Sequence, residues 1–238
     1  MELQSQVTEV RHNYKLTSLF VLCSYCLSPI IHADGLAIDK VYHPYVQPLE
    51  REVEWRMISA DGEQKHRLGI GQSLSERLFV EGYLIVSNNE SSIDAYEAEA
   101  KWQLTEQGEY AVDWGVIVEL EKDRYDNNWE LASGLLMEKE WGTWTGSANL
   151  WAIYEWGDTI QSDIESALAL QVRYRYSRYF EPALEFYSGQ NTRGIGPAIM
   201  GDMKFSAGKK LHWEVGNILG LDSTTPDNTW RFLAEFEF

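Results

Sequence analysis

From residue 50 to the C-terminus, apolar and polar residues alternate in short segments separated by turn residues. Because successive strand side chains point to opposite faces, this period of two predicts β-strands with one apolar and one polar face. Twelve such segments are present, at residues 50–58, 66–74, 78–87, 95–104, 109–121, 129–139, 144–156, 166–176, 180–188, 195–205, 210–220 and 229–238. No helical period interrupts them, so the sequence predicts an all-β fold.

Segment 109–121 shows both faces. Its apolar face holds Val112, Trp114, Val116, Val118 and Leu120, and its other face holds Asp113, Gly115, Ile117, Glu119 and Glu121. Most segments are near the roughly 9 to 11 residues of a tilted transmembrane strand, whereas soluble strands usually have about five or six. Length therefore favours a membrane barrel. The alternation alone leaves open which face is inside, because a soluble barrel turns its apolar face inward.

The connections between segments suggest two different rims. Longer polar connections follow the odd-numbered segments, as at 123–128, 157–162, 189–194 and 222–228, and shorter ones follow the even-numbered segments, as at 106–108 and 141–143. An even-stranded barrel with both termini in the periplasm has this alternation of outer loops and inner turns. We therefore predict a single antiparallel transmembrane β-barrel of 12 strands.

The last segment alternates strictly and ends on an aromatic residue, with Trp230, Phe232, Phe236 and Phe238 on one face. It resembles the C-terminal sorting signal of Gram-negative outer-membrane β-barrel proteins. The resemblance implies an outer-membrane location, contact with outer-membrane lipids and recognition by the barrel-assembly machinery through the C-terminal strand. Ten Trp residues fit the aromatic belts of such barrels. We expect a monomer.

The N-terminus has the features of an export signal. Arg11 and Lys15 precede an apolar run at 16–31, and Ala33 ends a small-residue cleavage site, which predicts cleavage between Ala33 and Asp34. A signal-anchor helix is the alternative, although the run is shorter than the roughly 20 residues of a spanning helix. Three regions follow: a signal peptide at 1–33, an irregular periplasmic segment at 34–49, and the barrel at 50–238. Both cysteines lie in the signal, so we expect no disulfide.

Charge limits the range of functions. The chain carries 37 acidic and 20 basic residues, a net charge of −17, which argues against nucleic-acid binding. The polar faces of the strands supply the candidates for a charged lumen: Glu52, Glu54, Arg56, Glu97, Glu99, Lys101, Asp113, Glu119, Arg173, Arg175, Glu185, His212, Glu214, Arg231, Glu235 and Glu237. We expect a narrow or occluded lumen, because buried charges require partners. If water passes, acidic walls favour cations.

Four functional classes fit these residues. The lumen residues fit a small-solute or cation channel, or a structural envelope barrel. An outer-membrane enzyme acting on lipid or peptide at the outer rim is an alternative, with His66, Ser73 and Ser75 as the serine-type candidates. His212 beside Glu214 is interpreted as a lumen pair. A soluble periplasmic β-barrel that binds a ligand is the fourth class. We predict no catalytic residue, cofactor or metal ion.

Overall fold

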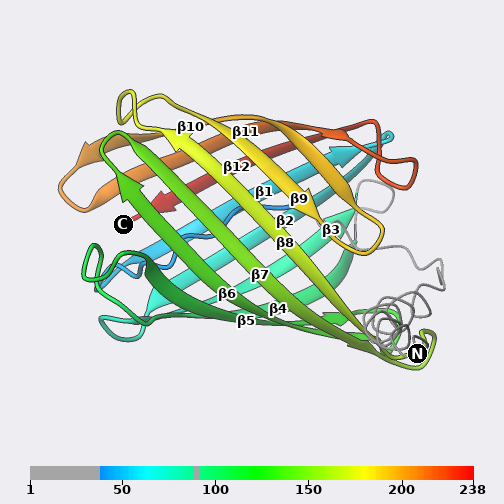
Figure 1. Ribbon diagram of the computed structural model, residues 1–238. Helices are drawn as coiled ribbons and strands as arrows, with labels where there is room; N and C mark the ends of the chain where they lie inside the picture. Colours follow the sequence, from blue (N-terminus) through cyan, green and yellow to red (C-terminus); the bar gives the residue numbers. More distant parts are fainter. Residues whose placement is uncertain (1–37, 88–91) are drawn as a thin grey trace, which may run out of the picture. The chain divides into compact units, whose positions relative to one another are not determined.

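The computed structural model describes residues 38–87 and 92–238, and these form an antiparallel, closed barrel (Figure 1). Its strands are β1 (Arg51–Ala60), β2 (Glu63–Ser73), β3 (Leu78–Ser87), β4 (Ile93–Gln103), β5 (Asp113–Asp123), β6 (Trp129–Trp141), β7 (Trp144–Trp156), β8 (Asp163–Tyr174), β9 (Glu181–Ser188), β10 (Arg193–Ser206), β11 (Lys209–Gly220) and β12 (Asn228–Glu237). Each pairs with its neighbour in sequence, and β12 pairs with β1 to close the wall. The predicted all-β barrel of 12 strands is confirmed.

The C-terminal strand is the one that closes the barrel. Glu52 lies opposite Glu237, and Val53 lies opposite Phe236. The Phe238 amide donates to the Arg51 carbonyl at 2.8 Å, so the pairing continues to the last residue. We call the end of the barrel where β1 begins and β12 ends the terminal rim, and the opposite end the far rim.

The apolar faces point outward. On β1, Glu54 is fully buried whereas Trp55 is 38% exposed. The same contrast recurs around the barrel, where the exposed large apolar side chains include Val53, Leu68, Ile70, Leu84, Tyr96, Trp102, Val118, Leu120, Leu131, Leu150, Tyr154, Ile164, Val172, Leu184, Leu219 and Trp230. An apolar surface of this extent is typical of a membrane-facing wall. A soluble barrel with an apolar core, one of the alternatives above, needs the opposite arrangement and is excluded.

Aromatic pairs lie near both rims. Trp129 and Trp156 stack with ring centroids 6.2 Å apart at the far rim, and Trp144 packs on Tyr174 at 4.9 Å near the terminal rim. Trp and Tyr at these levels match the girdles that meet lipid headgroups. In the described part of the chain, no helix has the length and apolar character to cross a membrane.

Two connections differ from the expected alternation of long and short loops. At the far rim, β1 and β2 are joined by Asp61 and Gly62 alone, both with positive φ, as a tight hairpin turn requires. At the terminal rim, β5 begins at Asp113 rather than at residue 109. Residues 104–112 form a longer turn because Gly108 donates to the Asp113 carboxylate and Thr105 Oγ1 accepts the Trp114 amide proton.

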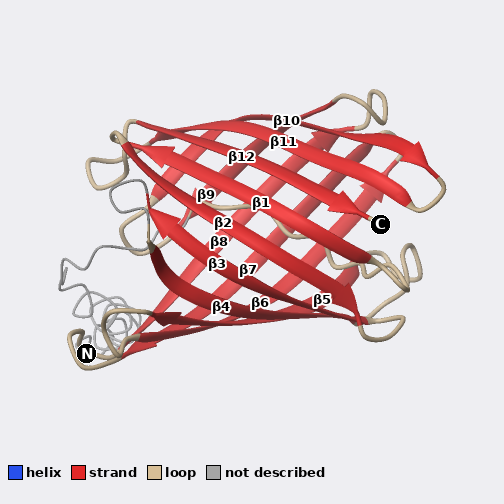
Figure 2. Ribbon diagram, turned by 180° about the vertical axis from the view of Figure 1, so that it is seen from behind, coloured by secondary structure: helices blue, strands red, loops and turns tan. Residues whose placement is uncertain are grey.

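Residues 38–50 contain no helix or strand. Residues 34–49 are predicted to lie in the periplasm, but from residue 38 the segment lies within the barrel, where its trace is visible behind the front strands (Figure 2). It passes from the level of Ile218 on β11 to the terminal rim, where it enters β1. We call residues 38–49 the inner segment.

Candidate functional site

The inner segment is hydrogen-bonded to two strands of the barrel wall, β7 and β4. The Asn149 side chain on β7 accepts from the Tyr42 amide at 2.7 Å and donates to the Tyr42 carbonyl at 2.8 Å. The Tyr42 hydroxyl donates to Glu99 on β4 at 3.0 Å, and the Val46 amide donates to Gln103 at 2.8 Å. These partners are buried, so the contacts hold the segment against this part of the wall.

Apolar side chains hold the same segment at two points. Ile38 and Val41 pack with Ala169, Tyr187 and Ile218, and Tyr42 packs with Ile117, Leu136 and Trp151. Gly115 provides the space for Pro44, because a Cβ at residue 115 would lie 2.9 Å from the Pro44 Cβ. Burial of these groups stabilises the segment inside the wall.

A first charge network joins the inner segment to β1 and β2. Arg56 contacts the Asp39 carboxylate at 2.6 Å and the Glu54 carboxylate at 2.6 Å. The Lys40 ammonium forms an ion pair with the other oxygen of Glu54, also at 2.6 Å. Arg67 extends the network, with contacts of 3.2 Å to Asp39, 3.1 Å to Glu97 and 3.4 Å to Glu121. Buried charges are tolerated when they are paired in this way.

A second network is centred on Arg231 of β12. Its guanidinium holds Glu185 through two nitrogens and contacts Glu214 at 2.7 Å. His212 lies between Glu214 and Asp202, with its ring nitrogens 3.0 and 2.8 Å from the two carboxylates. Gly216, which pairs with Arg231, leaves room for this side chain, because a Cβ there would lie 2.9 Å from the Arg231 Nε.

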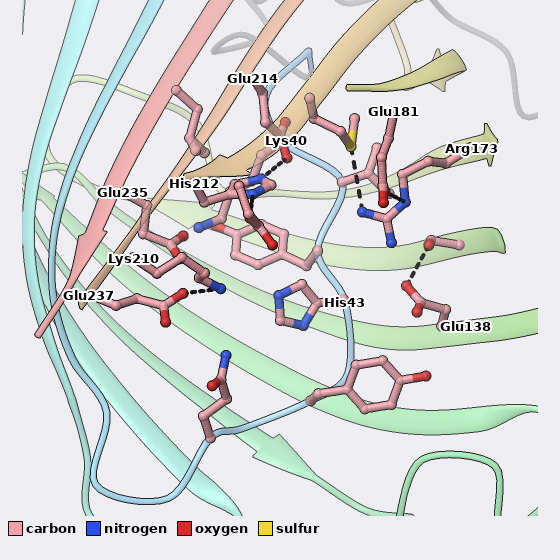
Figure 3. Close-up of a pocket in the computed structure, with 18 of the residues that line it drawn as sticks. Lys40, His43, Glu138, Arg173, Glu181, Lys210, His212, Glu214, Glu235 and Glu237 are labelled. Atoms are coloured by element: carbon pink, nitrogen blue, oxygen red, sulfur yellow. Dashed lines mark hydrogen bonds and ion pairs between the residues drawn. The ribbon is translucent and has the colours of Figure 1, made fainter. Parts of the chain in front are cut away.

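A cavity of about 370 Å³ lies between the inner segment and the terminal rim (Figure 3). Lys40, Lys101, Arg173, Arg175, Arg178 and Lys210 line it, but acids outnumber these bases: Glu50, Glu52, Glu81, Glu99, Glu138, Glu140, Glu181, Asp202, Glu214, Glu235 and Glu237. His43 also lines it; burial, and then the nearby Lys101, lower its pKa well below the usual value, so the ring is neutral at neutral pH. An acid-rich wall attracts cations.

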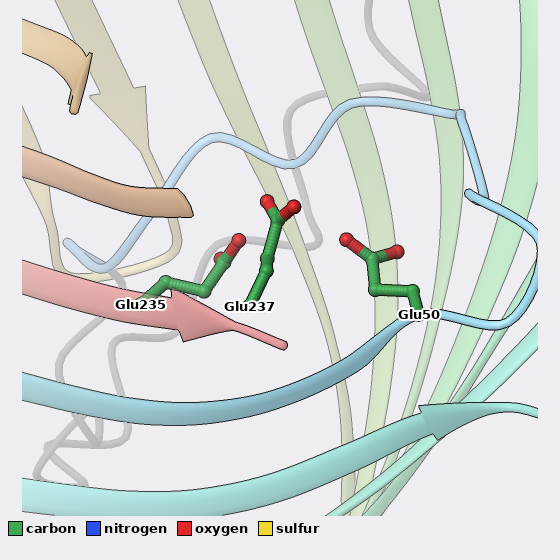
Figure 4. Close-up of side chains that lie close together, drawn as sticks. All are labelled: Glu50, Glu235 and Glu237. Atoms are coloured by element: carbon green, nitrogen blue, oxygen red, sulfur yellow. The ribbon is translucent and has the colours of Figure 1, made fainter. Parts of the chain in front are cut away.

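Three carboxylates converge at the rim side of the cavity. Glu50, Glu235 and Glu237 have oxygens within 4.8 Å of one another (Figure 4). Lys210 forms an ion pair with Glu237. Burial, and then the charge of Glu237, raise the pKa of Glu50 to about 7. The charge at this entrance therefore changes near neutral pH.

The predicted lumen residues lie on the inner face of their strands, except Arg175, which follows the end of β8. Glu52, Glu54, Arg56, Glu97, Glu99, Asp113, Glu185, Glu214, Arg231 and Glu237 are buried; Lys101, Glu119, Arg173, His212 and Glu235 are partly buried; and Arg175 is exposed near the terminal rim. The structure brings most of them into the two networks or the cavity. Asp113 instead caps the 104–112 turn and accepts from Tyr45 at 2.8 Å.

Other predicted positions have different surroundings. Trp230, Phe236 and Phe238 are exposed, and Phe232 stacks on Trp230 with ring centroids 6.3 Å apart. Their role as a sorting signal stays a prediction. Ala33 and Asp34, the predicted cleavage site, lie outside the described residues.

Sequence reasoning missed the residues that position the inner segment. Tyr42, Asn149, Gln103 and Gly115 were not identified as functional candidates. One signal was available, since Asn149 is a polar residue on the inward-facing side of β7. Its partner, 107 residues earlier in the chain, had no period that would place it inside the barrel.

The serine-type candidates do not come together. His66 accepts from the Trp55 indole at 3.3 Å and stacks on its ring, while the Ser73 hydroxyl donates to the Gln47 carbonyl. Both nitrogens of His212 are engaged by carboxylates. These contacts give neither histidine a hydroxyl nucleophile.

No family model matches the sequence, and no curated protein matches it. Solved structures do match its fold. The KdgM porin in complex with disordered oligogalacturonate aligns with a TM-score of 0.54 and 14% identity, covering 79% of this chain and 98% of that one. An outer membrane channel from Pseudomonas putida F1 aligns with a TM-score of 0.54 and 14% identity, covering 87% and 99%. The NanC porin gives 0.53 and 12%, covering 79% and 100%.

These similarities establish the fold. The chain has the closed antiparallel barrel of outer-membrane porins and channels, as the sequence resemblance implied.

Proposed function

We propose that the protein is a monomeric outer-membrane channel that conducts small cations and is narrowed by its inner segment. Export through a cleaved signal, insertion by the barrel-assembly machinery and recognition of the C-terminal strand belong to the same proposal. The observation that carries it is the acid-rich cavity of about 370 Å³ inside a closed, membrane-facing barrel. A cavity of this size accommodates hydrated ions and small solutes.

The inner segment explains how such a barrel would restrict flow. It is attached to β4 and β7 by hydrogen bonds and to β1 by ion pairs. An ion that enters the cavity at the terminal rim meets Lys40, Tyr42 and His43 before the far half of the lumen. Conduction thus depends on how firmly this segment is held.

A structural envelope barrel is the second candidate, and the two buried charge networks favour it. Arg56 and Arg231 are each 2% exposed and ion-paired to buried carboxylates, as in a permanently closed interior. Both candidates use the same residues, so the residues do not distinguish them. Measurements of ionic current through the barrel do.

The test is single-channel recording from the folded mature protein in a planar bilayer with a salt gradient. Discrete steps with a reversal potential that indicates cation preference would support the channel. A silent bilayer from protein with verified heat-modifiable gel migration would reject the channel and favour the structural barrel. Anion preference would reject the cation assignment.

A further inference from the structure

We propose that Glu52, Glu54 and Glu81 form a binding site for a divalent cation, and that the Lys40 ammonium is an intramolecular competitor for this site. The inference deepens the proposed function and rests on it where it assigns a resting place to a permeating cation. Binding itself is measured without any current.

The three carboxylates have the spacing of cation ligands. Their oxygens lie within 4.8 Å of one another, and all three residues are buried. Oxygens that share a Ca²⁺ at about 2.3 to 2.6 Å are separated by at most about 5 Å. The cluster thus matches the ligand separation of a calcium ion without movement of the backbone.

The strand register brings these acids together. Glu52 of β1 pairs with Gly71 of β2, which pairs with Glu81 of β3. Across this row, only a glycine separates the two acids. A Cβ at Gly69 would lie 2.4 Å from the Glu81 Oε1, and one at Gly71 would lie 3.3 Å from the Glu81 Cδ. Two glycines on β2 therefore create the space into which Glu81 leans.

Glu81 provides an independent indication of a missing partner. Glu81 is 6% exposed, and its Oε1 has no hydrogen-bond partner among the described residues. Glu52 is equally buried. A buried carboxylate without a partner is costly unless a cation or proton compensates its charge. A bound divalent cation satisfies both acids at once.

Lys40 explains why the inner segment matters to this site. Its Nζ lies 2.6 Å from the Glu54 Oε2, while the Arg56 Nε holds the Glu54 Oε1 at 2.6 Å. The Lys40 side chain is only 13% exposed, so this ion pair is shielded from water. The Lys40 ammonium therefore occupies the oxygen that Glu54 would offer to a metal ion.

The test is calorimetric titration of Ca²⁺ into the folded mature protein, first stripped with chelator, in detergent micelles. Lys40→Met is expected to bind one Ca²⁺ at least about tenfold more tightly than wild type, about 1.4 kcal/mol, because Glu54 Oε2 is released. Lys40→Gln is a second variant with the same expectation, and Lys40→Arg retains the competing charge and should resemble wild type. Heat-modifiable migration verifies the fold of each.

Glu81→Gln in the Lys40→Met background should abolish this binding. Glu76→Gln in the same background is the matched control, since it removes an exposed turn acid that does not line the cavity, and it should leave the affinity unchanged. Unchanged affinity in Lys40→Met and Lys40→Gln, or Ca²⁺ binding that survives Glu81→Gln, would overturn the site. A silent bilayer with intact Ca²⁺ binding would instead reject only the channel.

Discussion

The side-chain amide of Asn149 pairs with the backbone of Tyr42 through two hydrogen bonds, of 2.7 and 2.8 Å, as a neighbouring strand would. Asn149 is fully buried and Tyr42 is 5% exposed. The pair provides the inner segment with partners for an amide and a carbonyl that water cannot reach. It is therefore the contact whose removal should most directly release the segment from the wall.

Asn149→Leu should make open states more frequent in planar-bilayer recordings. The substitution leaves the Tyr42 amide and carbonyl unpaired, at a cost of about 1 to 3 kcal/mol. Thr145→Val is the matched control on the same face of β7, because the Thr145 hydroxyl is buried without a hydrogen-bond partner in the described chain. Identical opening in Asn149→Leu and wild type would show that this contact does not limit current.

Arg56→Met should destabilise the folded barrel far more than loss of a surface pair. It removes the shorter ion pair of Asp39, which keeps only Arg67, and leaves Glu54 with Lys40 alone; breaking a buried pair costs about 3 to 5 kcal/mol. Arg77→Met is the comparison, because the Arg77–Glu106 pair has side chains 45% and 61% exposed and contributes about 0 to 1 kcal/mol. Urea unfolding in micelles, followed by Trp fluorescence, would measure both; equal losses would contradict the buried-network account.

The strand pattern was predictable from the sequence because one physical rule sets it. Each wall residue faces either lipid or lumen, so the period of two runs almost unbroken, and residues 78–87 and 144–156 match β3 and β7 at both ends. The start of β5 was not predictable in this way. Tyr110 and Val112 continue the alternation, but hydrogen bonds to Asp113 and Trp114 fold residues 104–112 into a turn instead.

The contents of the lumen were predictable in kind and not in arrangement. Alternation identifies Glu54 and Glu99 as inward-facing, but it does not show that Lys40 and Tyr42 reach them from a segment with no period of its own. Glycine has a similar ambiguity. In a sequence, Gly69 weakens a strand, whereas in the structure it provides the space for Glu81 and Tyr83.

Gly69→Ala should destabilise the barrel by about 1 to 3 kcal/mol through overpacking. The added Cβ would lie 2.4 Å from the Glu81 Oε1 and 2.5 Å from the Tyr83 ring. Gly82→Ala on the adjacent strand is the control, since its nearest neighbour would be 3.9 Å away, and it should be neutral or slightly stabilising. The same urea titration applies, and a neutral Gly69→Ala would mean that Glu81 moves away at no cost.

Cation selectivity should increase as the pH rises from about 6 to about 8. The pKa of Glu50 is raised to about 7, by burial and then by Glu237, so this carboxyl loses its proton within that interval and adds negative charge to the entrance. Glu50→Gln should flatten the pH dependence of the reversal potential. Glu76→Gln removes an exposed acid from a turn at the same rim and should leave the dependence intact; the opposite ranking would place the titrating group elsewhere.

Cysteines placed on the two opposite faces of β8 should differ in their reaction with thiol reagents when the protein is in a lipid bilayer. Leu170 points to the outer face and Arg173 lines the cavity. In a chain that lacks Cys23 and Cys26, Arg173→Cys should react with a charged, water-soluble maleimide, because the cavity is open to water at the terminal rim. Leu170→Cys should be shielded, because lipid tails exclude the charged reagent. Both should react with a small apolar maleimide, which confirms that the two thiols are free.

Rapid labelling of Leu170→Cys by the charged reagent would place the apolar face in water and reject the membrane-spanning arrangement. Labelling of neither position by that reagent would show that the cavity is sealed from the terminal rim, the result expected of a structural barrel.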